Sequence, residues 1–129
     1  SSTVIDYGSG SGILSIGAKL FGAKLVEGIE LDRDAINNSK TNNHLNKVNI
    51  PYYNSNTFKT KRKYNVIISN ILLPTLIELS SNFKKLASKK IVLSGILDYQ
   101  TEELIKSYDW VQLKQINEMD NWVLLFGEL

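Results

Sequence analysis

The chain has 129 residues, a formal net charge of +2 and 43% hydrophobic residues. This length fits one globular domain with a single core. Because the chain contains no cysteine and one histidine, it excludes a disulfide framework, a cysteine-based zinc site and a thiol nucleophile, and we expect no metal. No apolar run approaches the roughly 18 residues of a transmembrane helix, so we expect a cytoplasmic protein without a membrane partner.

Short apolar runs rich in β-branched residues, which are typical of buried strands, recur along the chain. Between them lie segments whose apolar residues recur every three to four positions, as in helices. The expected strands are residues 3–7, 24–29, 48–53, 64–69, 90–94, 110–116 and 122–129. The expected helices are residues 13–21, about 34–45, 76–86 and 101–108. The polar and basic stretch 54–63 is typical of a loop.

Capping residues support these helices. Gly22 stands where a helix C-terminal cap belongs. Either Asp32 or Asp34 is suited to start the second helix, and Asn46 to end it. Pro74 falls in the N-terminal turn of the third helix, where proline is favourable. We expect the first helix to bury an apolar face made of Ile13, Leu14, Ile16, Ala18, Leu20 and Phe21.

Strands and helices alternate five times, which implies right-handed crossovers and a mostly parallel sheet. The last two expected strands have no helix between them, so one of the two must run antiparallel. We therefore predict an α/β fold, a three-layer αβα sandwich with a Rossmann-like seven-strand sheet. Six strands are expected to be parallel and the last one antiparallel.

Three alternating glycines follow the first expected strand, in Asp6-Tyr-Gly-Ser-Gly-Ser-Gly12; residues 8–12 are called the glycine loop below. Ligands of open parallel sheets bind beyond the carboxyl ends of the strands. Glycines let the backbone approach a ligand closely, and the start of the following helix offers amide donors to an anionic group. The alternative is a loop that merely needs positive φ angles. The pattern favours a nucleotide-type ligand, but not a dinucleotide, because the G-x-G-x-x-G fingerprint would place its last glycine at Ile13.

Glu30 ends the second expected strand. A carboxylate at this position accepts hydrogen bonds from both ribose hydroxyls and disfavours a 2′-phosphate. Asp32 is a weaker candidate for the same role. The alternative for Glu30 is an exposed charge at a strand end.

Several segments together resemble one family. These are the glycine loop, Gly28-Ile-Glu-Leu-Asp-Arg-Asp34, Ser69-Asn-Ile-Leu72, Leu93-Ser-Gly-Ile-Leu97 and Asn121-Trp122. They resemble the PrmA family of ribosomal protein L11 methyltransferases, and Ser-Asn-Ile-Leu followed by Leu-Ser-Gly-Ile-Leu is the more specific part. The resemblance implies a class I methyltransferase fold and S-adenosyl-L-methionine as cofactor. It also implies that residues 1–129 form the catalytic domain, with the family's separate N-terminal substrate-recognition domain absent.

The resemblance assigns roles to individual residues. It implies that Gly8, Gly10 and Gly12 surround the methionine part of the cofactor. Glu30 would hold the ribose and Asn56 would face the adenine. Asn70 would face the transferring methyl and is the expected catalytic residue. The full set expected to bind the cofactor is Asp6, Gly8, Ser9, Gly10, Gly12, Glu30, Leu31, Asn56 and Asn70.

Asn70 ends the fourth expected strand. Its side-chain carbonyl is able to accept a hydrogen bond from an amine and so orient the lone pair without a charged base. The alternative is that Asn70 caps the helix that contains Pro74. Trp122 is expected either to wall the substrate side or to be a core residue.

The expected function is S-adenosylmethionine-dependent N-methylation of a ribosomal protein, at lysine side chains or an N-terminal α-amine, as in the family. One alternative is an N-methyltransferase acting on nucleic acid. The basic runs at 59–63, 84–85 and 89–90 lack interleaved aromatic residues, so nucleic acid is not the expected partner. Another alternative is a degenerate cofactor-binding domain without independent catalysis, suggested by Asn56 and Asn65, where the family commonly has acidic residues.

Overall fold

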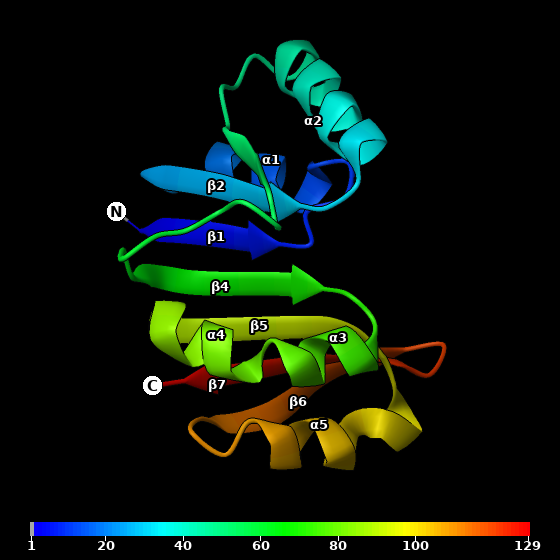
Figure 1. Cartoon of the computed structure of the whole chain (residues 1–129). Coiled ribbons are helices and arrows are strands. Elements are labelled where there is room, and N and C mark those ends of the chain that lie inside the picture. Colours follow the sequence, from blue (N-terminus) through cyan, green and yellow to red (C-terminus); the bar gives the residue numbers. More distant parts are fainter. Residues whose placement is uncertain (1) are drawn as a thin grey trace.

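A computed structural model describes residues 2–129, which form one seven-stranded sheet flanked by helices (Figure 1). The order across the sheet is β3-β2-β1-β4-β5-β7-β6. β1 to β5 pair in parallel, whereas β7 is antiparallel to both β5 and β6. The predicted sheet, with only its last strand antiparallel, is therefore confirmed. The strands are β1 (Thr3–Tyr7), β2 (Leu25–Glu30), β3 (Tyr52–Asn54), β4 (Tyr64–Asn70), β5 (Ala87–Leu97), β6 (Gln112–Met119) and β7 (Trp122–Glu128).

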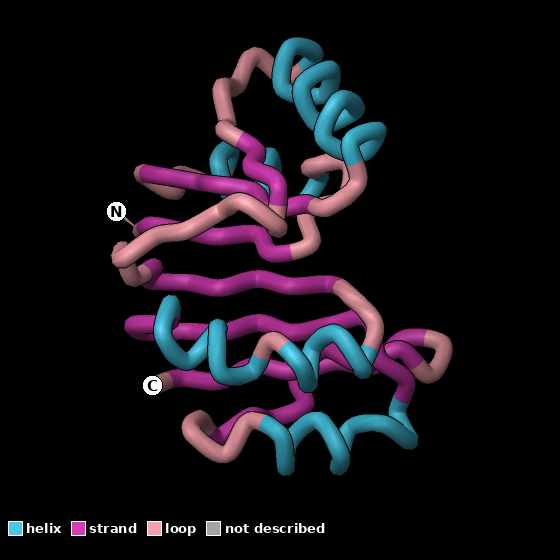
Figure 2. Tube along the Cα trace, in the orientation of Figure 1, coloured by secondary structure: helices cyan, strands magenta, loops and turns pink. Residues whose placement is uncertain are grey.

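Helices cover both faces of the sheet, as predicted for a three-layer sandwich. Figure 2 shows α3, α4 and α5 on one face, with α1 on the opposite face. Helix α2 packs against β3 and β2 near the sheet edge. The helices are α1 (Ile13–Leu20), α2 (Arg33–Leu45), α3 (Leu73–Glu78), α4 (Ser80–Leu86) and α5 (Thr101–Ser107), with a short 3-10 turn at Asp98–Gln100 before α5. None of the helices within residues 2–129 is both long and apolar enough to cross a membrane.

The boundaries differ from the sequence-based prediction where pairing or capping decides them. The helix predicted over 76–86 begins earlier, at Leu73, and is divided at Leu79 into α3 and α4. β5 is longer than predicted because β4 and β7 pair with it on both sides. β3 is shorter because it is an edge strand that pairs with β2 alone. The β6–β7 turn is tighter than predicted, since β6 runs to Met119.

Helix α1 buries only part of the apolar face predicted for it, namely Ile16, with Ala18 packed against the same small cluster. Leu20 is 61% and Phe21 95% exposed, and Ile13 and Leu14 are also exposed. The buried side of α1 carries the polar Ser15 next to Ile16. Ser15 is drawn toward the sheet because its hydroxyl donates a 2.6 Å hydrogen bond to the buried carboxylate of Asp6.

The core lies mainly on the α3–α5 face of the sheet. Ile67, Leu93 and Leu125, from β4, β5 and β7, are fully buried in one cluster that includes side chains of α3, α4 and α5. On the other face of these strands the alternating residues, such as Val92 and Phe126, are only partly buried. The helix layer on that face covers β1 to β3, where a smaller cluster surrounds Ile16.

Candidate functional site

A cavity of about 580 Å³ opens at the carboxyl ends of β1, β2 and β4; it is called the loop cavity below. This is the edge at which open parallel sheets bind their ligands. The structure brings together four of the predicted cofactor residues here: Gly8, Glu30, Leu31 and Asn56. The complete lining is Tyr7, Gly8, Ile29, Glu30, Leu31, Ser55, Asn56, Ile71, Thr75, Glu78, Leu79 and Asn82.

The glycine loop is held in place by its own backbone hydrogen bonds. The N–H groups of Gly8 and Ser9 both donate to the carbonyl of Ile29, at 2.8 and 2.9 Å. The N–H of Gly12 donates to the carbonyl of Ser9. These three amides are therefore already paired and are not available to a ligand.

The three glycines have different roles. All adopt positive φ angles, but Gly8 is the one that lines the loop cavity. A Cβ at Gly10 would meet no atom within 4 Å, so the loop is open at this point. A Cβ at Gly12 would instead collide with the hydroxyl of Tyr52 and crowd Ser39. Gly12 is thus needed for packing inside the protein. The resemblance implies a different role for it, next to the methionine part of the cofactor.

Glu30 joins the glycine loop to the turn that follows β2. Its Oε1 accepts a 2.8 Å hydrogen bond from the N–H of Gly10. Its Oε2 accepts from the N–H groups of Leu31 and Asp32, at 2.8 and 2.9 Å. A carboxylate accepts about four hydrogen bonds, so one acceptor position remains for a hydroxyl, and a second hydroxyl would displace one of these amides. Asp32 itself caps α2 by accepting a hydrogen bond from the N–H of Asp34. This capping role explains an aspartate at the position without a ribose contact.

Asp6 lies beneath the loop rather than in the cavity. It is 1% exposed, and its Oδ1 has no hydrogen-bond partner within the described structure. Burial raises the pKa of Asp6 from 3.8 to about 6, although the hydrogen bond from Ser15 acts in the opposite direction. The nearby charge of Glu30 adds a further increase. Ser9 is also buried, with its hydroxyl unpaired, so both side chains support the loop from inside.

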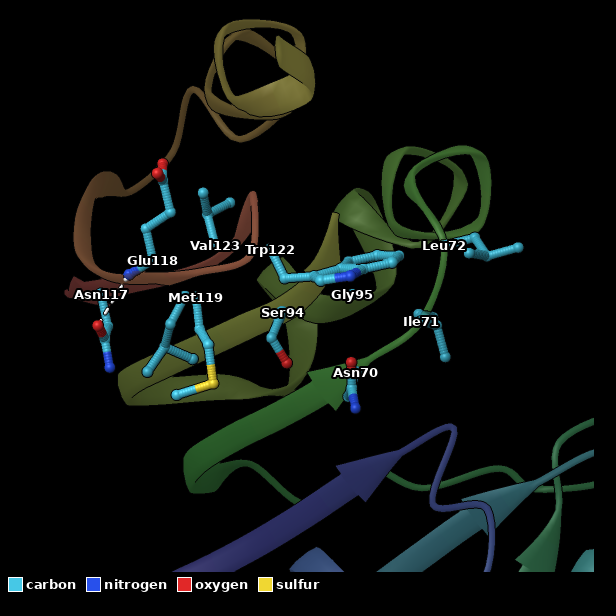
Figure 3. Close-up of a pocket in the computed structure, with 11 residues that line it drawn as sticks. Asn70, Ile71, Leu72, Ser94, Gly95, Asn117, Glu118, Met119, Trp122 and Val123 are labelled. Atoms are coloured by element: carbon cyan, nitrogen blue, oxygen red, sulfur yellow. Dashed lines mark hydrogen bonds between the residues drawn. The ribbon is translucent and has the colours of Figure 1, made fainter. Parts of the chain in front are cut away.

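A second cavity, of about 590 Å³, lies beside the first and is called the hairpin cavity. It contains Asn70 at the end of β4, Ser94 in β5, and Met119 and Trp122 from the β6–β7 hairpin. Figure 3 shows these four side chains around one space, whereas the carboxylate of Glu118 points away from Asn70. The groups nearest Asn70 are therefore uncharged polar or apolar side chains.

Two alternatives for the residues of this cavity are excluded by the structure. Asn70 does not cap α3, because the residue at the N-cap position is Leu72 and the cap lacks a side-chain hydrogen bond. Trp122 is not a core residue, because it is 49% exposed. Asn65 lies at the opposite end of β4 from Asn70, where its Oδ1 accepts from the N–H of Thr3. Asn65 thus contributes to the junction of β1 and β4 rather than to either cavity.

Sequence reasoning missed the helical wall of the loop cavity. Thr75 and Glu78 of α3, Leu79 between the helices and Asn82 of α4 all line it, at a spacing of three, four and seven residues that a single helix would place on one face. That spacing was a usable signal. Sequence reasoning also missed Ile71, which lines both cavities, because no sequence pattern marks a residue that separates two sites.

Comparison with known proteins shows a match over the whole chain. Residues 1–129 match the family model of ribosomal protein L11 methyltransferase (PrmA). The curated relatives include ribosomal protein L11 methyltransferases of Dictyoglomus thermophilum, 32% identical over 130 residues, and of Laribacter hongkongensis, 36% identical over 129 residues. Each alignment covers 97% of this chain but 43% of the relative, so the chain spans less than half the length of these proteins.

Solved structures agree with this match. The structure of a ribosomal protein L11 methylase from Lactobacillus delbrueckii subsp. bulgaricus superimposes with a TM-score of 0.87 at 26% identity, covering 98% of this chain and 69% of that one. A methyltransferase from Pyrococcus furiosus shares the fold, with a TM-score of 0.82 at 17% identity over 98% of this chain and 74% of that one. On the family match and the sequence identities, the chain belongs to the ribosomal protein L11 methyltransferase (PrmA) family.

Proposed function

We propose that residues 1–129 are the catalytic domain of an S-adenosylmethionine-dependent methyltransferase, which transfers methyl groups to amines of a ribosomal protein. The observation that carries this proposal is the pair of cavities that share Ile71. The loop cavity offers the carboxylate of Glu30 and Gly8, whereas Asn70 lines the hairpin cavity and not the loop cavity. Family membership supports the same reaction, because the relatives are named ribosomal protein L11 methyltransferases.

The loop cavity fits the proposed cofactor in its chemistry. Its volume lies within the range of small-molecule sites, and the free acceptor position of Glu30 suits a ribose hydroxyl. Asn56 and Leu31 lie at the same cavity and are positioned to contact an adenine ring. When bound, S-adenosylmethionine supplies a sulfonium methyl that an amine attacks in line. The work left to the protein is to position the amine and to exclude water.

Asn70 and its uncharged surroundings suit a neutral amine acceptor. A lysine side chain has a pKa of about 10.4 and an α-amine one of about 7.7 to 8.0, so deprotonation at pH 7 costs about 4 to 5 and about 1 kcal/mol respectively. The carboxylate of Glu118 lines the hairpin cavity but points away from Asn70, so the surroundings of Asn70 do little to stabilise the ammonium form. We propose that the amide oxygen of Asn70 accepts a hydrogen bond from the neutral amine and aims its lone pair at the methyl. Met119 and Trp122 then hold the aliphatic part of the acceptor.

The first test is calorimetric titration of the chain with S-adenosylhomocysteine. Glu30→Ala is expected to weaken binding at least about tenfold, because a hydrogen bond to a charged group contributes about 1.5 to 3 kcal/mol. Glu103→Ala removes an exposed carboxylate on α5 and is the matched control, with binding unchanged. Absence of binding to the wild type at millimolar ligand would favour a degenerate domain instead.

The second test is methyl transfer to recombinant ribosomal protein L11, with an RNA substrate run in parallel. Asn70→Ala is expected to lower the rate about a hundredfold while leaving cofactor binding intact, because misplacing a reactant costs about that much. Asn38→Ala, at an exposed position of α2, controls for the loss of an asparagine. Transfer to RNA alone would refute the ribosomal protein acceptor, and an unchanged rate in Asn70→Ala would refute the role of that residue.

A further inference from the structure

The segment Asn70-Ile71 is held between two glycines that lie far apart in the sequence. β4, which ends at Asn70, lies between β1 and β5 in the sheet. On the β1 side, a Cβ at Gly8 would collide with Cγ2 of Ile71. On the β5 side, a Cβ at Gly95 would lie 2.5 Å from the carbonyl oxygen and 2.8 Å from the nitrogen of Ile71. Because a Cβ at either position would collide with Ile71, both Gly8 and Gly95 must be glycine.

Gly95 reaches this position because β5 is distorted there. The register of β5 with β7 shifts between Leu93 and Ile96, as at a β-bulge, and Gly95 has a φ of +92°. The same Cβ at Gly95 would also lie 2.9 Å from Oδ1 of Asn70. A side chain at this position would push Asn70 and Ile71 toward β1 and hence toward the glycine loop.

The end of β4 is also tied to β1 by a hydrogen bond. The hydroxyl of Ser69 donates to the carbonyl of Tyr7 at 2.7 Å. Ile71 itself lines both the loop cavity and the hairpin cavity. The side chain that touches Gly8 is thus part of the wall between the two sites, one residue after Asn70.

We propose that Ile71 is a positioning residue: its Cγ2 methyl, set against Gly8 by the close approach of Gly95, couples the glycine loop to Asn70. The position of the loop then fixes where Asn70 meets the acceptor amine. The steric coupling stands on the geometry alone, whereas its consequence for methyl transfer rests on the proposed function. The contact depends on the β-branch of isoleucine, because Cγ2 is the atom that meets Gly8.

The coupling is tested by nuclear magnetic resonance of the amide groups of Gly8 and Gly10 in the free protein. Gly95→Ala is expected to shift both resonances. Gly22→Ala is the matched control, because Gly22 also has a positive φ, of +100°, but a Cβ there meets no atom within 4 Å. In an Ile71→Ala background, Gly95→Ala is expected to leave both resonances where Ile71→Ala alone places them. Equal shifts in both backgrounds, or none in either, would overturn the proposal.

A second test uses substitutions that preserve or remove the β-branch. Ile71→Val keeps the branch, and its affinity for S-adenosylhomocysteine and its kcat with ribosomal protein L11 are expected to stay within about twofold of wild type. Ile71→Leu keeps the volume but loses the branch, and kcat is expected to fall about tenfold. If Ile71→Leu retains more activity than Ile71→Val, the side chain only fills space and the proposal fails. If the wild type binds no S-adenosylhomocysteine while the amide shifts follow the expected pattern, the proposed function fails and the steric coupling stands.

Discussion

The loop cavity and the hairpin cavity have nearly the same volume, about 580 and 590 Å³, but are built in different ways. The loop cavity is framed by a backbone whose polar groups are paired within the chain, with Glu30 alone accepting from three amides. The hairpin cavity is framed by side chains, of which Met119 is 72% and Trp122 49% exposed. The shape of the first therefore depends on the fold, whereas the second can change its lining without changing the fold.

This difference separates the expected effects of substitutions. A change beneath the loop cavity alters the free energy of unfolding along with ligand binding, because the same hydrogen bonds serve both. A change in the hairpin cavity is expected to alter the interaction with the proposed acceptor and to leave stability nearly constant, because an exposed side chain contributes little to the core. The following predictions test this separation.

The largest effect is expected from the titration of Asp6. Its pKa is raised from 3.8 in the usual case to about 6 in the folded chain, so the folded state binds the proton more tightly than the unfolded state. The stability that this proton provides is fully present below pH 4 and is lost as the pH rises through 6. At 1.36 kcal/mol per pKa unit, the loss amounts to about 3 kcal/mol.

Urea unfolding of Asp6→Asn checks this prediction. Relative to wild type, the free energy of unfolding of the variant is expected to be about 3 kcal/mol larger at pH 8 than at pH 3, so that the variant is relatively more stable at the higher pH. Ser15→Ala removes a hydrogen bond that lowers the pKa of Asp6, so its pH-dependent loss is expected to exceed that of wild type. A difference between Asp6→Asn and wild type that does not change with pH would contradict the prediction.

A smaller effect is expected from Gly12→Ala. The new Cβ would collide with the hydroxyl of Tyr52 at a φ of +85°, so the variant bears both backbone strain and a displaced aromatic ring. We expect a loss of about 2 kcal/mol in the free energy of unfolding, measured by urea denaturation. Gly10→Ala shares the positive φ but meets no atom within 4 Å, and it is expected to lose about 1 kcal/mol. Equal losses in Gly12→Ala and Gly10→Ala would show that the collision with Tyr52 does not contribute to the destabilisation.

The two cavities also differ in how far the sequence predicted them. Gly8 and Glu30 were predicted from a local pattern at the carboxyl end of a strand, whereas Asn70 was predicted from the family resemblance. Ser94 and Met119 were not predicted, because the pairing of β4 with β5 sets Ser94 beside Asn70 and the order β5-β7-β6 brings Met119 to the same cavity. That order depends on pairing between strands distant in the sequence, which no local pattern contains.

The sheet was predicted correctly from the sequence, whereas the buried side of α1 was predicted only in part. Alternating strands and helices sufficed for the sheet, because crossovers are right-handed and short. The exposed apolar residues of α1 were assigned to the core because periodicity shows that a helix has an apolar face, without showing what covers it. The buried side of α1 combines Ile16, in an apolar cluster with Val4 and Val26, with the hydrogen bond from Ser15 to Asp6, a polar contact between adjacent elements that hydrophobicity does not reveal.

The smallest effect is expected in the hairpin cavity, from Trp122→Ala. Losing one aromatic wall of the proposed acceptor site is expected to raise KM for ribosomal protein L11 about tenfold, equivalent to about 1.4 kcal/mol. Affinity for S-adenosylhomocysteine and the free energy of unfolding are expected to stay at wild-type values, because Trp122 is half-exposed and outside the loop cavity. Tyr99→Ala removes an aromatic residue that is 77% exposed and is the matched control. A weaker affinity for S-adenosylhomocysteine with an unchanged KM would place Trp122 on the cofactor side, and the two cavities would then not be separable by substitution.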